Sequence, residues 1–272
     1  MRYSYLMKKH FSVCGLLMLA FALQSAPALA KEYEGFSLDR YKLCVREVSI
    51  DAQQAYERAN QWRKSGGGAS AMHCEALALS ELQVFPSSAK LLERLAKLDE
   101  IEDDEQRAEI FLQAGHAWIL ADRGPKARKA FDKGLDYAGL TSHPLLGSEL
   151  LIGKARGFVL DEEWDDAVEI LDGLLTILPQ QYDAILLRGS ISRASGDYSA
   201  ATRDIATYLA LLPNEISGLM ERGFLRLDIR DLHGAREDFN LVVELSPDSR
   251  QSLVARQQIS KIDLRLPHQD GK

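Results

Sequence analysis

The sequence has few residues of the kinds that bind metals or carry out redox chemistry. It contains three cysteines and six histidines, with no C-x-x-C and no H-E-x-x-H motif. A structural or catalytic zinc site needs such clusters, and a thioredoxin-like site needs paired cysteines. We therefore expect no metal site and no cofactor.

Long apolar runs are also missing. No stretch reaches the roughly 18 to 20 apolar residues that a membrane-spanning helix needs. The most apolar stretch, about 11–23, follows three basic residues and precedes a small-x-small ending at Ala28 and Ala30. This order is typical of a secretory signal peptide. We expect cleavage near Ala30, so that the mature chain begins at Lys31 without direct membrane insertion.

Positive charge is in short supply as well. The chain has 33 Lys and Arg against 40 Asp and Glu, a net charge of −7, and removal of a basic signal segment makes the mature chain more negative. Nucleic acids and anionic lipid surfaces attract basic proteins. We therefore do not expect either as a partner.

Two cysteines remain after signal cleavage, Cys44 and Cys74. Exported proteins enter compartments where disulfides form and persist, so a bridge between these two residues is the expected state. The alternative is a pair of unrelated thiols.

The stretch RKSGGGASAMHCEA (63–76) resembles a catalytic or phosphate-binding motif at first sight, because three glycines precede an adjacent histidine and cysteine. A phosphate-binding loop needs G-x-x-x-x-G-K-[ST], and here the lysine comes before the glycines. Neighbouring residues on a helix point about 100 degrees apart, so His73 and Cys74 cannot form a catalytic dyad. We interpret the glycines as a turn, and we expect no catalytic residue.

The most informative pattern is a period of thirty-four residues in the second half of the chain. It is carried by prolines and small residues, namely Pro179, Pro213 and Pro247, Ala167, Ala201 and Ala235, and Gly189 and Gly223. Each unit contains two amphipathic segments separated by a turn such as SGD and ended by a proline. A single helix pair cannot bury its apolar face, whereas stacked pairs can.

In its period, small residues, GDY turn and prolines, the sequence resembles the tetratricopeptide repeat (TPR) family. The resemblance implies an all-α, right-handed superhelical solenoid of antiparallel helix pairs with capping helices at both ends. The expected organisation is a signal peptide (1–30), an amino-terminal capping helix segment (31–66), a degenerate first unit (67–106), a second unit with a loop insertion (107–147), three in-register units (148–249), a carboxy-terminal capping helix (250–265) and a disordered tail (266–272).

In this family the first helix of each unit lines an inner groove that binds peptide segments. Projecting that face by helical spacing gives one candidate partner-binding set. It consists of Leu112, His116, Ile119, Ile152, Arg156, Val159, Leu186, Ser190, Arg193, Met220, Phe224 and Leu227. An apolar segment held by a carboxylate on Arg156 and Arg193 is the expected ligand. The alternative is that a capping helix or a second copy of the chain fills the groove.

The resemblance therefore implies a non-catalytic scaffold for a protein or peptide partner, in the bacterial periplasm or secreted. Two other hypotheses stay open. One is a self-assembling structural protein of the cell envelope, for which a homo-oligomer is the natural form. The other is an enzyme whose catalytic residues are scattered beyond recognition.

Overall fold

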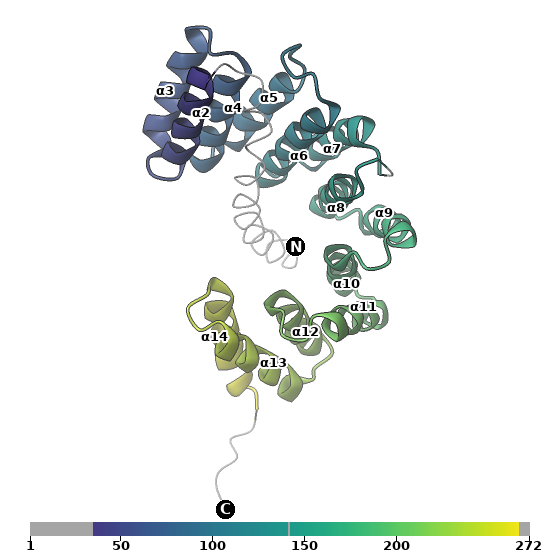
Figure 1. The fold of residues 1–272 in the computed structure, drawn as a ribbon. Helices are drawn as coiled ribbons and strands as arrows, with labels where there is room; N and C mark the ends of the chain where they lie inside the picture. The colour runs from purple at the N-terminus through teal and green to yellow at the C-terminus, as the bar shows by residue number, and fades with distance from the viewer. Residues whose placement is uncertain (1–34, 141, 267–272) are drawn as a thin grey trace, which may run out of the picture. The chain divides into compact units, whose positions relative to one another are not determined.

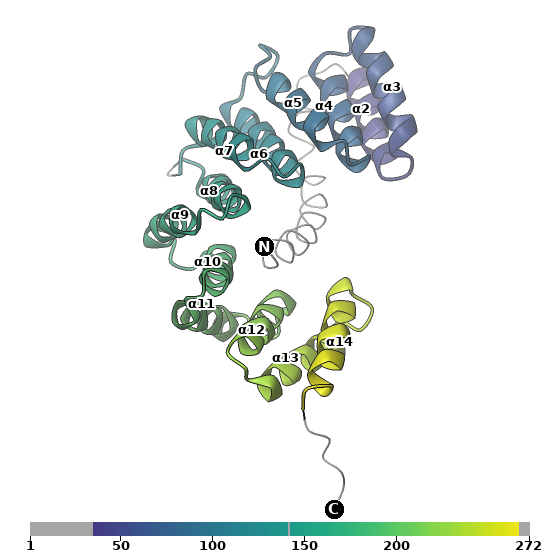
Figure 2. The same ribbon diagram turned by 180° about the vertical axis from the view of Figure 1, so that it is seen from behind.

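The computed structural model describes residues 35–140 and 142–266, and every element in that part of the chain is an α-helix. This confirms the expected all-α fold. Within each of the two units described below, consecutive helices run side by side in both views (Figures 1 and 2). The expected signal segment, and the tail from residue 267 on, lie outside the described residues. In the part described, no helix combines the length and apolar character that a bilayer crossing needs.

The chain divides into two compact units, with the division between Ile170 and Leu171. Unit 1 contains α2 (Gly35–Val48), α3 (Ala52–Lys64), α4 (Gly68–Glu81), α5 (Phe85–Leu95), α6 (Asp104–Leu120), α7 (Gly124–Ala138) and α8 (Pro144–Leu160). Helix α9 (Trp164–Ile177) contains the division. Unit 2 continues with α10 (Tyr182–Ser195), α11 (Tyr198–Leu211), α12 (Ile216–Asp228), α13 (Leu232–Leu245) and α14 (Arg250–Asp263).

Side-chain caps set the starts of several helices. Asp197 and Asp231, thirty-four residues apart, each accept a backbone N–H from three residues ahead, in α11 and α13 respectively. Asp51 caps α3 in the same manner, and Asp103 caps α6 by accepting from the backbone N–H of Glu105, two residues ahead. These caps satisfy N–H groups that have no partner within the helix. The acidic run before α6 is therefore a helix start.

Glycines on the first helices allow aromatic rings of the second helices to approach closely. A Cβ atom added at Gly115 or at Gly153 would overlap the ring of Phe131, and one at Gly223 would lie 2.7 Å from the Phe239 ring. Both phenylalanines are fully buried. The small residues of the period are thus the places where helices meet.

Repeated ion pairs join the two helices of each pair in unit 2. Arg188 of α10 holds Asp204 of α11 through two hydrogen bonds of 2.8 and 2.7 Å. One repeat later, Arg222 of α12 holds Asp238 of α13 in the same way. Each arginine directly precedes a glycine of the period, Gly189 or Gly223, so the same place in each repeat supplies both an ion pair and a close helix crossing.

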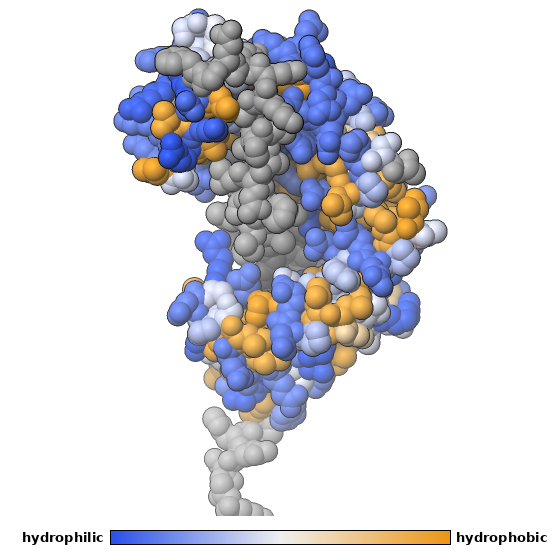
Figure 3. Space-filling model, viewed as in Figure 1, coloured by the Kyte–Doolittle hydropathy of each residue, from blue (hydrophilic) through white to orange (hydrophobic). Residues whose placement is uncertain are grey.

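Exposed apolar residues also follow the repeat. Ile177, Leu211 and Leu245 end α9, α11 and α13, and they are 57%, 43% and 43% exposed. In the region of α12 and α13, apolar side chains appear between polar ones on the visible surface (Figure 3). Single apolar residues of this kind are ordinary on a protein surface.

The helix boundaries add detail to the expected organisation. The amino-terminal segment is a pair of helices, α2 and α3, broken at the Asp51 cap, and α6 begins at Asp104. The surplus residues near 140–147 only partly form a loop, because α8 already begins at Pro144. On α14, Ile262 and Ala255 are buried in the core of unit 2, whereas Leu253 is 61% exposed.

Candidate partner-binding surface

The twelve residues projected from the sequence are here called the first-helix face, and they belong to both units. In unit 1, α6 carries Leu112, His116 and Ile119, and α8 carries Ile152, Arg156 and Val159. Leu112, Ile152 and Val159 are buried at 9%, 3% and 5% exposure. They pack into the unit and leave His116, Ile119 and Arg156 as the partly accessible members.

His116 and Arg156 come together from neighbouring helices. Burial, and secondarily the positive charge of Arg156, lower the pKa of His116 to about 3. The imidazole also stands edge-on to the buried Phe131 ring, with centroids 5.5 Å apart. His116 is therefore neutral at physiological pH beside the guanidinium of Arg156.

Arg156 is the unusual group of this face. Its Nε atom is buried, and no hydrogen-bond acceptor for it exists among the described residues. A buried N–H without an acceptor is rare in folded proteins, and a carboxylate is the strongest acceptor that a guanidinium can find. The partly accessible side chain of Arg156 thus holds a buried, unsatisfied donor behind the predicted face.

Carboxylates gather at the opposite end of the same two helices. The pKa of Glu109 is raised by burial first, and then by the negative charges of Glu105, Asp103 and Glu149. Glu109 precedes His116 by two helical turns on α6, and Glu149 has the same relation to Arg156 on α8. The first-helix face of unit 1 therefore has a negative end and a positive end.

In unit 2 the predicted residues are organised differently. Ser190 and Met220 are buried at 8% and 7% exposure, and the Ser190 hydroxyl donates to the Leu186 carbonyl. Leu186, Arg193, Phe224 and Leu227 remain partly accessible.

Arg193 already has partners inside unit 2. Its Nε donates to Glu221 at 3.0 Å, its Nη1 donates to Asp228 at 2.9 Å, and the guanidinium lies 5.6 Å from the Phe224 ring centroid. Burial acts to lower the pKa of Arg193, but the two carboxylates outweigh it and raise that pKa. Its charge is balanced within the chain, so we do not include Arg193 as a carboxylate anchor in the site proposed below.

A buried polar cluster joins three helices of unit 1. His73 on α4 bonds Tyr41 of α2 through Nδ1 at 2.6 Å and Gln113 of α6 through Nε2 at 2.8 Å. Because the Gln113 oxygen can only accept, Nε2 carries the proton and Nδ1 accepts from the tyrosine hydroxyl. Burial lowers the pKa of His73 and raises that of Tyr41. The histidine of the glycine-rich stretch is therefore neutral and structural.

Next to this cluster, Cys44 of α2 and Cys74 of α4 face each other with their Cα atoms 6.2 Å apart. That separation lies inside the range of bridged cysteines. His73 and Cys74, although adjacent, are directed to different partners, as their positions on one helix indicated. In the described ranges, no group of three His, Cys, Asp or Glu side chains is arranged to hold a metal ion.

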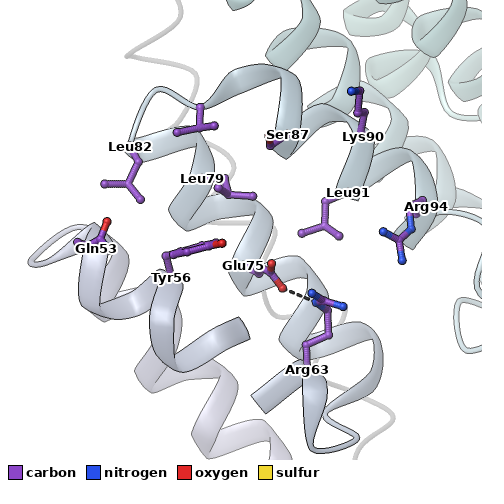
Figure 4. A pocket seen from close by; sticks show the side chains of 11 residues that line it. Gln53, Tyr56, Arg63, Glu75, Leu79, Leu82, Ser87, Lys90, Leu91 and Arg94 are labelled. Atoms are coloured by element: carbon purple, nitrogen blue, oxygen red, sulfur yellow. Dashed lines mark hydrogen bonds and ion pairs between the residues drawn. The ribbon is translucent and has the colours of Figure 1, made fainter. Parts of the chain in front are cut away.

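The projection of the first-helix face missed an open cleft of about 480 Å³ between α3, α4 and α5 (Figure 4). It is lined by Gln53, Tyr56, Arg63, Glu75, Leu79, Leu82, Val84, Ser87, Lys90, Leu91 and Arg94. None of these belongs to the first-helix face. The cleft could not be predicted because the first repeat has a degenerate register. The sequence pattern that could have indicated it is the basic pair Lys90 and Arg94 on one face of α5.

The low pKa of His116 predicts a loss of stability in mild acid. The unfolded chain protonates this residue near pH 6.5, whereas the folded chain does so only near pH 3. Unfolding therefore takes up a proton between these values, so stability is complete above pH 6.5 and falls as the pH drops toward 3. One such group contributes up to about 2 kcal/mol between pH 6.5 and 5.

The measurement is urea unfolding of the wild type and of His116→Gln at pH 7 and pH 5. We expect the variant to lose less free energy of unfolding on acidification, because glutamine does not titrate. His73 shifts in the same direction and is present in both proteins, so the difference between them isolates His116. Equal pH dependence in the two proteins would contradict the assignment.

Comparison with solved structures identifies the architecture. A tetratricopeptide repeat protein from Parabacteroides merdae ATCC 43184 matches with a TM-score of 0.62 at 18% identity, over 96% of this chain and 98% of that chain. YrrB, described as a TPR protein with an unusual peptide-binding site, matches with a TM-score of 0.44 at 16% identity, over 73% and 96%. MamA from Desulfovibrio magneticus RS-1 gives 0.47 at 18%, over 74% and 98%. No family model and no curated protein matches the sequence.

Proposed function

This chain has the tetratricopeptide-repeat fold, and we propose that it is a non-catalytic scaffold that binds a protein or peptide segment on the first-helix face of unit 1. The observation that carries the proposal is the buried, unpartnered Nε of Arg156. A carboxylate of the bound segment pairs with the partly accessible guanidinium, whose Nε turns from its buried position to complete its hydrogen bonding, and Ile119 offers apolar contact beside it. The carboxylates of Glu109 and Glu149 favour a segment whose other end is basic.

The proposal includes an exported location. The basic start, short apolar stretch and small-x-small ending of residues 1–30 support a signal peptide. The facing positions of Cys44 and Cys74 support a disulfide in an oxidising compartment such as the periplasm. The acidic net charge is consistent with a protein partner and disfavours nucleic acid.

The test compares the mature wild-type chain with Arg156→Gln. Each is immobilised, partners are captured from the envelope extract of the source bacterium, and the affinity of the main captured protein is then measured with purified components. We expect Arg156→Gln to weaken binding at least tenfold, which is about 1.4 kcal/mol, because a carboxylate loses its charged donor. Helical content should be unchanged.

Arg256→Gln is the matched control, because Arg256 is exposed on α14 of unit 2 and carries the same charge. It should retain wild-type affinity. If Arg156→Gln also retains it, the binding surface lies elsewhere. Sedimentation of the purified chain addresses self-assembly, since an oligomer that Arg156→Gln disperses would favour a second copy as the occupant of this face.

A further inference from the structure

The cleft between α3, α4 and α5 has an apolar interior. Leu79 of α4 and Leu91 of α5 point into the space between the helices, and Tyr56 of α3 lies opposite them (Figure 4). Leu82 and Val84 extend this surface toward the turn between α4 and α5. The volume of about 480 Å³ is within the roughly 300 to 1,000 Å³ typical of ligand sites, enough for a few apolar side chains.

One ion pair inside the cleft is already complete. The buried carboxylate of Glu75 accepts from Arg63 of α3, as the dashed line in Figure 4 marks, and from Asn60 Nδ2 at 2.9 Å. Arg63 therefore serves to hold α3 against α4. It is not the group that a ligand would meet first.

The remaining charges of the lining are both positive. Lys90 and Arg94 are exposed, lie one helical turn apart on α5, and have no ion pair among the residues that the structure describes. The lining thus has three cations and a single carboxylate, in a chain whose net charge is −7. Of the carboxylates close by in sequence, Glu57 accepts from Gln53 and Glu93 accepts from Trp118.

We propose that this cleft is a second docking site, which takes an acidic amphipathic segment of a partner protein. Apolar side chains of the segment enter between Tyr56, Leu79 and Leu91, and its carboxylates pair with Lys90 and Arg94. A uniformly charged polyanion would leave the apolar interior unfilled. Complementary charge at the rim with apolar burial at the centre is the usual anatomy of a protein interface.

The experiment uses the mature full-length chain and a fluorescein-labelled peptide of about 12 residues, with leucine at helical i, i+3, i+4 and i+7 spacing and glutamate elsewhere. Fluorescence anisotropy at low salt should show saturable binding with a Kd below about 100 μM. The double variant Lys90→Glu/Arg94→Glu should weaken it at least tenfold. A peptide with lysine in place of glutamate should bind the wild type more weakly.

Arg250→Glu/Arg256→Glu is the matched control, because it changes the net charge equally at exposed positions of α14 in unit 2. It should bind like the wild type. Arg156→Gln should do the same, which separates this site from the first-helix face. The proposal fails if no binding occurs, if the control weakens binding as much as the cleft variant, or if only Arg156→Gln abolishes it.

Discussion

Replacing Phe131 with alanine should destabilise unit 1 by about 3 to 5 kcal/mol, the range found for removal of a buried aromatic ring. The ring is fully buried on α7 and fills the space that Gly115 of α6 and Gly153 of α8 leave open. Because glycine has no side chain, neither residue can fill the void that removal of the ring leaves. The three helices must therefore either keep a cavity or shift toward one another.

The measurement is hydrogen exchange followed along the chain, together with thermal unfolding. In a repeat protein each helix pair contacts only the neighbouring pairs. Faster exchange should therefore concentrate in α6, α7 and α8, the helices that contact Phe131. Phe239→Ala is the matched variant, because Phe239 fills the equivalent place beside Gly223 and should loosen α12 and α13 instead. Equal loss of protection in both regions by either variant would show that the chain unfolds as one cooperative body.

Breaking the proposed Cys44–Cys74 bridge should cost about 3 to 4 kcal/mol in the chain-entropy model, given a closed loop of 30 residues. Helix α2 packs against α3 and α4, is the first helix that the structure describes, and carries Cys44. Exchange in α2 should therefore rise first on reduction. The contacts of Tyr41 with His73 should loosen with it.

The comparison is thermal unfolding of the exported protein with and without reductant. Cys44→Ser/Cys74→Ser provides the control, because reductant should not change its unfolding temperature. Intact mass after alkylation without reduction reports the state of the thiols directly. Two alkylated cysteines in the exported protein would refute the bridge.

Much of the fold could be predicted because the repeat makes one local pattern recur. Pro213, Gly223 and Ala235 each occupy a place that helix geometry requires, so the helix pairs and their stacking followed from spacing alone. The degenerate first repeat was harder, since its helices are held by Tyr41, His73 and Gln113. These residues lie on α2, α4 and α6, and no periodicity links them.

The candidate site was only partly predictable for a related reason. Helical spacing places Arg156 and Arg193 on the same kind of face, because it records the direction of a side chain from its own helix. Helical spacing does not specify which groups of the neighbouring helix contact that side chain. Glu221 and Asp228 of α12 neutralise Arg193, whereas α6 brings the neutral His116 to Arg156.

By itself, then, the sequence determined the all-α class, the helix pairs and the positions of their close crossings, because these depend on local periodicity and on small residues at fixed spacing. Only the tertiary structure decided which charged groups are satisfied and where the surface is hollowed. Those properties depend on pairs of residues from different helices, such as Glu75 with Arg63 or Leu79 with Leu91. The physical reason is that hydrogen bonding and burial are set by neighbours in space, and a repeat pattern specifies neighbours only where the repeats are alike.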